Sequence, residues 1–360
     1  MNVVIHRLLS LTASLLVGLT MLLAAPRPAG AAVPNVWAFA YNDNPTPPPA
    51  SVMNPAYQWG SFKTTCPGSM ATITQVAVGK YVVTFPCSAS SNGIVHVTAV
   101  NNNARYCEIE GWADAGAAKV VTVLCFKGPA ADNSMFTVTY TTSSGAPAGG
   151  AHAYVFSSPT GVVIAGYNSA GPANSVTHVA TGRWDVKLPL LSTGTYDGDL
   201  QATAVHPNDA PRRCKIDNWI NVIPDYRVQI SCTDPNGVLV DTWFTMSYHF
   251  KRSVAGTAPG SLAYMTNLPG APPGSDYNPV APPNAFTSTP PGRYTTVFPG
   301  VGTGATHMQV TALGGPFGYY CQLERVWTIA GGTVTGSLIC FNNVGVTTDN
   351  LLFATYTSHL

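Results

Sequence analysis

The sequence predicts an all-β protein of three tandem β-sandwich domains, each with a cross-strand disulfide. Three observations support this prediction. Short runs of alternating apolar and polar residues are separated by turns rich in Gly and Pro, which number 34 and 30, a pattern typical of strands. Five short blocks recur three times in the same order, which indicates an internal repeat. Six of the eight cysteines occupy matching places in these copies.

The clearest recurring block contains a cysteine followed by a tryptophan. It spans residues 106–112 and returns at 213–219 and, with one inserted residue, at 320–327. The first cysteines of successive blocks lie 107 residues apart. A glycine turn recurs at Gly79, Gly182 and Gly292, and a Thr-Ala pair recurs at Thr98, Thr203 and Thr311. A closing strand recurs at Phe136, Phe244 and Leu352, and an opening Ala-Tyr pair recurs at Ala40-Tyr41, Ala153-Tyr154 and Ala263-Tyr264.

The copies divide the chain into three repeats, each of a size at which a domain folds independently. We place repeat one at residues 32–142, repeat two at 151–250 and repeat three at 261–360. The segments 141–150 and 251–260 are rich in Gly, Ala, Pro and Ser, a composition typical of linkers. The sequence therefore predicts three domains joined by linkers.

Repeat one contains seven alternating runs, at residues 37–41, 72–78, 80–85, 94–100, 105–109, 119–126 and 136–141. Short strands at this spacing favour an immunoglobulin-like sandwich or a jelly roll. The tryptophan beside a buried disulfide is a feature of immunoglobulin domains, whereas the short spacing between the paired cysteines is not. Both topologies stay open, and the strand order is not predicted.

The eight cysteines predict four disulfides. Cys107 and Cys125 are 18 residues apart, as are Cys214 and Cys232, and Cys321 and Cys340 are 19 apart because of the inserted residue. Each first cysteine shares a strand face with the apolar residue two positions later, so these bridges should join neighbouring strands. Cys66 and Cys87 have no counterparts in the other copies and should pair by elimination. No C-x-x-C pair suggests a metal site instead.

Residues 1–31 are predicted to be a signal peptide. A basic residue, Arg7, precedes the apolar stretch 8–25, and Ala29-Gly30-Ala31 fits a cleavage site; an uncleaved membrane anchor is the alternative. Cleavage would leave 15 basic and 16 acidic residues, a balance that argues against a nucleic acid or an anionic membrane as partner. We therefore expect a secreted, extracellular protein in which disulfides are stable.

The repeated unit of Gly-Arg-Tyr, a Thr-Ala strand, Cys…Trp…Cys and a closing Phe/Tyr strand resembles a family. It is similar to the units of uncharacterised, tandemly repeated secreted proteins of high-GC Gram-positive bacteria. The resemblance covers nearly all of the chain after the leader. It implies export and brings no activity or site residues with it.

Charged residues recur at three places in each repeat. They are the acids Glu110, Asp217 and Glu324, the bases Lys80, Arg183 and Arg293, and the carboxylates Asp132, Asp241 and Asp349. They would form either three equivalent ligand sites or ion pairs and turn caps within each sandwich. Their recurrence in otherwise divergent repeats favours the structural interpretation. Spacing alone does not show which acid meets which base.

No residue is predicted to be catalytic. Glu108 and Glu110 are placed like a hydrolase's carboxylate pair, but Lys215 and Gln322 replace Glu108 in the other repeats, which favours a solvated strand face. No H-E-x-x-H, H-x-H or G-x-S-x-G motif occurs, and Gln replaces His96 in the other two copies. We therefore expect no metal and no cofactor, and regard an enzyme as the less favoured class.

Aromatic residues that do not recur are the best candidates for binding. Tyr57, Trp59 and Phe62 lie in a Pro-rich insertion of repeat one, and Tyr277 lies in repeat three. Exposed rings could contact a sugar or a protein partner; the alternative is that they fold back over the end of the sandwich as a plug. Trp243 is opposite in phase to Phe244 and is expected to be exposed.

These observations predict a non-enzymatic extracellular protein. It would act by surface recognition of a glycan, cell wall or protein, or serve as a structural module. The alternative is a secreted hydrolase with its site in an interdomain groove. The sequence gives no prediction of the oligomeric state.

Overall fold

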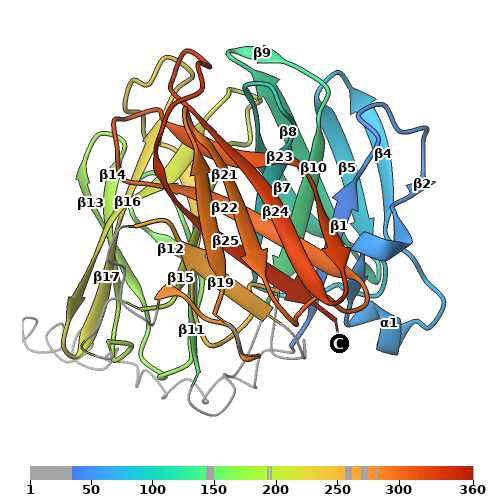
Figure 1. Cartoon of the computed structure of the whole chain (residues 1–360), viewed down its shortest axis with the longest axis horizontal. Coiled ribbons are helices and arrows are strands. Elements are labelled where there is room, and N and C mark those ends of the chain that lie inside the picture. The colour runs from blue at the N-terminus through green and yellow to red at the C-terminus, as the bar shows by residue number, and fades with distance from the viewer. Residues whose placement is uncertain are drawn as a thin grey trace, which may run out of the picture. The chain divides into compact units, whose positions relative to one another are not determined.

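A computed structural model describes residues 35–142, 150–192, 194, 197–255, 262–268, 275–280 and 283–359. The predicted leader, residues 143–149 of the first linker and 256–260 of the second lie outside the described residues. Within them the chain is nearly all-β, with twenty-five strands and two one-turn helices, η1 (Pro55–Tyr57) and α1 (Phe62–Thr65) (Figure 1). No helix in this part of the chain is long and apolar enough to span a membrane.

The seven strands predicted for repeat one are all present. Two of them, β5 (Lys80–Phe85) and β6 (Ile94–Val100), match the predicted limits. The remaining strands of repeat one are β1 (Trp37–Asn42), β2 (Ser51–Val52), β3 (Trp59–Gly60), β4 (Thr72–Ala77), β7 (Arg105–Ala115), β8 (Ala118–Lys127), β9 (Ala130–Ala131) and β10 (Met135–Thr141).

Repeats two and three contain counterparts of the seven strands predicted for repeat one. Repeat two consists of β11 (Ala151–Ser157), β12 (Val163–Asn168), β13 (Ser175–Ala180), β14 (Arg183–Leu188), β15 (Asp199–Val205), β16 (Arg213–Val222), β17 (Asp225–Thr233) and β18 (Trp243–Phe250). Repeat three consists of β19 (Leu262–Thr266), β20 (Ala285–Thr289), β21 (Arg293–Phe298), β22 (Thr306–Leu313), β23 (Tyr320–Ala330), β24 (Thr333–Phe341) and β25 (Leu351–Ser358).

Each repeat forms a sandwich of two facing layers. In repeat one, β1, β10 and β6 form one layer and β4, β5, β8 and β7 the other. Alternate residues of β5 are buried, and they meet Phe136, Val138 and Tyr140 of β10 in one hydrophobic core. Since side chains on a strand alternate between its faces, this pattern is what a two-layer core requires.

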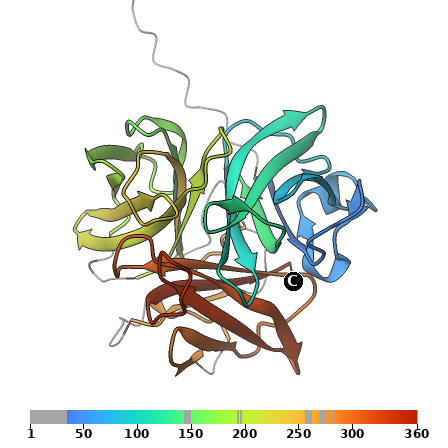
Figure 2. The ribbon, with the colours of Figure 1, turned by 90° about the horizontal axis from the view of Figure 1, so that it is seen from above.

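The sheets continue from one repeat into the next. Three parallel contacts join the repeats: β6 to β23, β15 to β7 and β16 to β22. Their paired residues, Val100 with Leu323, Val205 with Ile109 and Leu313 with Ile216, are equivalent positions of the three copies. The repeats therefore close into a ring within Pro34–Leu360, which forms a single compact unit (Figure 2).

Threonines of the repeated Thr-Ala pair link the repeats at the centre of the ring. The Oγ1 atoms of Thr203, Thr311 and Thr98 accept hydrogen bonds from the backbone N–H groups of Val97, Ala202 and Val310, at 3.4, 3.1 and 3.2 Å. Each bond runs from one repeat to another, and all three are buried. The Thr-Ala block thus recurs because its hydroxyl satisfies a backbone donor that would otherwise be unpaired.

The residue after the first cysteine of each block forms a second link between repeats. Glu108 is fully buried, and its Oε2 accepts from the N–H of Arg212 at 2.6 Å. Lys215 Nζ donates to the carbonyls of Gly314, Gly315 and Pro316 at 2.6–3.0 Å. Gln322 Nε2 donates to the carbonyls of Asn101 and, at 2.8 Å, Asn103. The prediction of a solvated Glu108 is therefore wrong, because that face packs on the neighbouring repeat.

The residues that precede the same cysteines meet one another. The Arg213 guanidinium lies over the rings of Tyr106 and Tyr320, 4.9 and 4.5 Å from their centroids. The two tyrosine rings are in edge contact at 5.5 Å. A desolvated guanidinium between two ring faces is a stabilising cation–π arrangement.

The four predicted disulfides are all present. The three repeated bridges join residues that pair directly between neighbouring strands, as in Cys107 with Cys125. Cys87, Leu190 and Gly300 each lie two residues after β5, β14 or β21, and all have positive φ values, of 48°, 59° and 74°. The three repeats therefore share this turn, although only repeat one carries a cysteine there.

One block assignment and one linker assignment differ in the structure. Ala38, not Ala40, is equivalent to Ala153 and Ala263, because it pairs with Tyr140 as they do with Tyr248 and Tyr356. The Ala-aromatic pattern occurs twice in β1, and a shift of two residues preserves the strand face. In addition, residues 252–255 of the second predicted linker are buried, since Ala255 packs with Trp37 and Phe39.

Candidate functional site

The recurring acids and bases form ion pairs, as the structural interpretation predicted. Lys80 meets Glu110 at 2.8 Å and Arg293 meets Glu324 at 2.9 Å, whereas Arg183 approaches Asp217 only to 3.8 Å. Each pair links the two strands that flank β8, β17 or β24 within one layer. These partly exposed pairs contribute little to stability individually.

The third recurring carboxylate is a turn cap, and its position in repeat one was assigned one residue too early. Asp241 and Asp349 each accept the N–H of a turn glycine, Gly182 or Gly292, at 2.6 Å. In repeat one Asn133 Oδ1 has this role toward Gly79, at 2.8 Å. Asp132 instead pairs with Arg105. An asparagine supplies the same acceptor, which a search for recurring charges overlooks.

Four of the histidines are enclosed in the interior of the protein. His96, His152, His249 and His307 are all buried, and burial lowers the pKa of His96 and His307 to about 3. Within the described residues no group of three His, Cys, Asp or Glu side chains could hold a metal ion. These imidazoles are neutral groups packed within the protein.

The predicted binding residues of the insertion fold back onto the body of the protein. Phe62 is fully buried in the core of repeat one. Trp59 lies against His359, with ring centroids 3.8 Å apart. Tyr57 meets the edge of Trp327 at 5.2 Å. Tyr277, likewise, stacks on Tyr264 at 5.6 Å. The three insertion residues therefore do not form an exposed patch, and their placement matches the plug interpretation.

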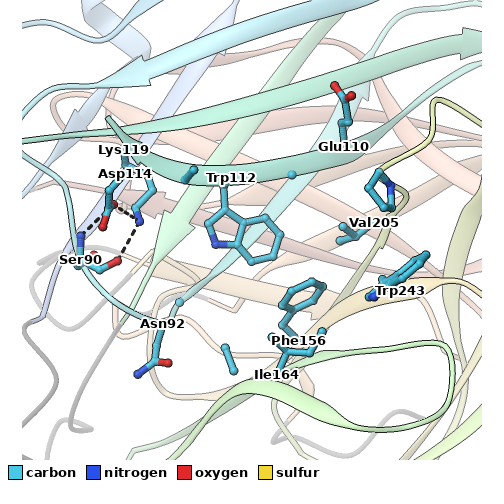
Figure 3. Close-up of a pocket in the computed structure, with 15 residues that line it drawn as sticks. Ser90, Asn92, Glu110, Trp112, Asp114, Lys119, Phe156, Ile164, Val205 and Trp243 are labelled. Carbon is cyan, nitrogen blue, oxygen red and sulfur yellow. Dashed lines mark hydrogen bonds and ion pairs between the residues drawn. The ribbon is translucent and has the colours of Figure 1, made fainter. Parts of the chain in front are cut away.

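An aromatic cleft lies instead between repeats one and two. It has a volume of about 440 Å³, and its apolar wall consists of Trp112 from β7, Phe156 from β11, Ile164 and Ala165 from β12, Val205 from β15 and Trp243 from β18. Figure 3 shows Trp112 projecting from its strand toward Phe156, with Trp243 beside them. We call this hollow the Trp112 cleft.

A β-bulge places Trp112 in this position. The pairing of β7 with β8 shifts register between Ile109 and Gly111, so one extra residue enters β7. Trp112 then lies opposite Val121, and Ile109 lies opposite Val123. The bulge thus places Trp112 and Ile109 on the same face of β7. The Trp112 ring packs on Phe156 with centroids 4.7 Å apart and planes inclined at 54°.

The two carboxylates at the rim of the cleft are already paired. Asp114 forms an ion pair with Lys119 and accepts the N–H of Ser90 at 3.2 Å, while Glu110 is held by Lys80. Four residues of extended strand place the Cα atoms of Glu110 and Asp114 roughly 13 Å apart, and each carboxylate points to its own lysine, unlike the facing carboxyl pair of a glycosidase. The site can bind a molecule, but it lacks a carboxylate pair suited to hydrolysis.

The equivalent places at the other two junctions are filled by the protein itself. At the junction of repeats three and one, Trp327 is 1% exposed and is covered by Tyr41 and Tyr57. At the junction of repeats two and three, Trp219 is 5% exposed and meets Phe353 at 5.2 Å. Trp112 is only half-buried. The Trp112 cleft is therefore the open member of three related junctions.

No family model, no curated protein and no solved structure matches the chain.

Sequence reasoning missed most of the Trp112 cleft. The tryptophan was recognised as recurring, but Phe156 and Ile164 were not singled out, and Trp243 was expected to be exposed whereas it is half-buried in the cleft wall. Trp243 is equivalent to Met135 and Leu351, so an aromatic residue at this position in one copy alone was the available signal. The sequence alone does not show that two repeats meet at Trp243, so this signal could not be interpreted as part of a cleft.

Proposed function

We propose that the protein is a secreted, non-catalytic recognition protein that binds its ligand in the Trp112 cleft. The observation that carries this proposal is the open aromatic wall of Trp112, Phe156 and Trp243 at a junction whose two counterparts are closed. Rings in a concave, mainly apolar site provide a large contact area at small entropic cost.

Secretion is supported by two features. Every cysteine is paired in a disulfide, a condition typical of chains that mature in an oxidising compartment. The sequence also begins with the predicted leader at residues 1–31.

A secreted hydrolase is the competing proposal, since the cleft does lie in a groove between repeats. The rim chemistry disfavours it. Glu110 and Asp114 are each neutralised by a lysine, and His206, the histidine in contact with Trp243, has its pKa lowered by burial. General acid–base catalysis needs a group poised to exchange a proton near the working pH.

A binding screen with defined probes tests the proposal. The exported chain is applied to an array of cell-surface glycans and to an array of short peptides, and in parallel to chromogenic esterase, glycosidase and peptidase substrates. We expect binding to at least one probe, with affinity lowered at least tenfold by Trp112→Ala or Trp243→Ala, as for the removal of a central aromatic contact.

Phe317→Ala is the matched control, because Phe317 is an exposed aromatic residue outside the cleft. It should bind as the wild type does. Absence of binding on both arrays would contradict the proposal, and turnover that depends on Glu110 or Asp114 would favour the hydrolase.

A further inference from the structure

We infer that the Trp112 cleft receives an aromatic side chain, tyrosine in particular, from a peptide segment of a partner protein. The inference rests on the proposed function and names the class of ligand. It follows from the way in which the protein fills the equivalent place at another junction between repeats.

The filled counterpart lies between repeats three and one. There the Tyr57 ring meets Trp327 edge-on, with centroids 5.2 Å apart and planes at 88°, and meets Tyr41 at 5.5 Å and 79°. Edge-to-face contacts of this kind are favourable beyond the area that they bury. Tyr57 belongs to η1, in a short segment with the sequence Asn54-Pro55-Ala56-Tyr57.

Phe156 corresponds to Tyr41 in this comparison. Phe156 pairs with Thr245 in β18, and Tyr41 pairs with Thr137 in β10; these two threonines are equivalent. Phe156 contacts Trp112, and Tyr41 contacts Trp327. In both cases the tryptophan belongs to the neighbouring repeat. The two junctions therefore present the same pair of rings.

The two junctions differ in what covers this pair. In repeat one, β3 lies beside β1, and Tyr57 comes two residues before β3. In repeat two, β12 takes the place of β3, and Ala165 lies opposite Phe156. A methyl group thus stands where the other junction has a phenol ring. The missing ring accounts for the hollow.

The polar rim favours a tyrosine over a sugar. A sugar ring carries several hydroxyl groups that each need a partner, whereas Asp114 and Glu110 are already paired. A phenol has only one hydroxyl. Asn92 is exposed and lines the cleft, as Figure 3 shows, and its amide can accept or donate one hydrogen bond.

The substitution Ala165→Tyr tests the inference because it supplies the missing ring and leaves the other residues of the cleft in place. Two probes are compared. One is a synthetic peptide with the sequence of residues 52–60, and the other carries Ala in place of Tyr57. Binding is followed by the indole N–H resonances of isotopically labelled protein, which report each tryptophan separately.

We expect the tyrosine peptide to shift the Trp112 and Trp243 resonances and to leave those of Trp219 and Trp327 in place. Ala165→Tyr should lower its affinity at least tenfold, whereas the matched control Ala165→Ser should not. Trp243→Ala, which adds no bulk, should lower the affinity similarly and covers the case in which Ala165→Tyr fails to fold.

Equal shifts with both peptides, or undiminished binding by Ala165→Tyr and Trp243→Ala, would overturn the inference. A glycan that shifts the Trp112 and Trp243 resonances when the tyrosine peptide does not would overturn it as well. That last outcome would leave the proposed recognition function intact, whereas no response to any probe would count against both.

Discussion

Buried histidine side chains form polar contacts between the repeats. His96 of repeat one lies 3.1 Å from Thr203 Oγ1 and 2.8 Å from Ser247 Oγ, both in repeat two. His307 of repeat three lies 2.6 Å from Thr137 Oγ1 of repeat one. Desolvation disfavours the protonated imidazole at both places. Each histidine is therefore part of the packing only while it is neutral.

Acid should destabilise the protein below about pH 6.5. The pKa of His96 and of His307 is about 3 in the folded chain, and burial also lowers the pKa of His152 and His249. In the unfolded chain the ordinary histidine value is about 6.5. Between these values the unfolded state binds more protons, so the free energy of unfolding falls as the pH falls.

Two buried carboxyls act in the opposite direction, since burial raises the pKa of Asp199 to about 7 and that of Glu108 well above its usual value. As the pH falls, these two carboxyls bind protons in the folded state before they would in the unfolded state. They therefore offset part of the destabilisation that the four histidines cause. Urea denaturation at pH 7.5 and pH 5.0 measures the balance.

His96→Gln is the informative variant, because Gln201 and Gln309 occupy the equivalent positions. It should reduce the slope of stability against pH by up to about 1.4 kcal/mol per pH unit. An unchanged slope would show that His96 does not titrate differently in the two states.

At this scale the sequence predicted the ion pairs and disulfides but not the cleft. The alternation of apolar and polar residues along a strand distinguishes its two faces. The polar face, which points away from the sandwich core, is predicted from this pattern to be exposed to solvent. Glu108, Lys215 and Gln322 lie on that face and are buried against another repeat. Nothing in the local pattern distinguishes a solvated face from one covered by a distant part of the chain.

Among the elements, the turn that starts with a recurring glycine is the most constrained. Gly79, Gly182 and Gly292 have φ values of 66–68° and precede β5, β14 and β21. A Cβ atom on Gly182 would lie 2.7 Å from Cys232 O and from Val240 N. Glycine is thus required there both for its backbone conformation and for the lack of a side chain.

Gly182→Ala should therefore lower the free energy of unfolding by at least about 2 kcal/mol. Gly116→Ala is the control, since Gly116 also has a positive φ, of 61°, but has open space where the methyl group would be placed. It should cost only about 1–2 kcal/mol. Equal costs in urea denaturation would mean that the close approach to Cys232 is unimportant.

Strand positions were predicted well because the alternation in each strand is local. The limits of β5 and β6 were found from that pattern alone. The bulge in β7 was not, because a strand with an inserted residue still alternates on either side of it. The same irregularity recurs between Ile216 and Asn218 in β16 and between Leu323 and Arg325 in β23, and it places each tryptophan at a junction.

For the whole molecule, the decisive feature is the closure of three repeats through parallel strand contacts. Each contact pairs a single residue of one repeat with a single residue of another, too little to leave a motif in the sequence. The internal repeat predicted three similar sandwiches of independent size. It could not show that each sandwich shares a sheet with both of its neighbours.

Repeat two expressed alone, as residues 150–255, should not unfold cooperatively as a monomer. It would expose the edges of β15 and β16 and leave Lys215 without its three carbonyl partners from repeat three. Exposed strand edges favour association with other chains. Sedimentation and thermal unfolding measure both properties.

A circular permutant that begins at residue 150 and joins residue 359 to residue 35 through a flexible linker is the control. It keeps every junction and should fold as a monomer, because Trp59 contacts His359 and Trp37 packs with Ala305, whose N–H donates to His359. A stable, monomeric repeat two would contradict the importance of the junctions.

The parallel contact of β6 with β23 also limits how the protein can change in evolution. An open array of repeats can gain or lose a copy and keep its contacts, provided that its ends are capped. Here the last copy binds the first, so a duplication or deletion would change the angle at every contact at once. New functions would therefore be expected to arise by substitution within the three existing copies, as the exchange of tyrosine for alanine beside the Trp112 cleft illustrates.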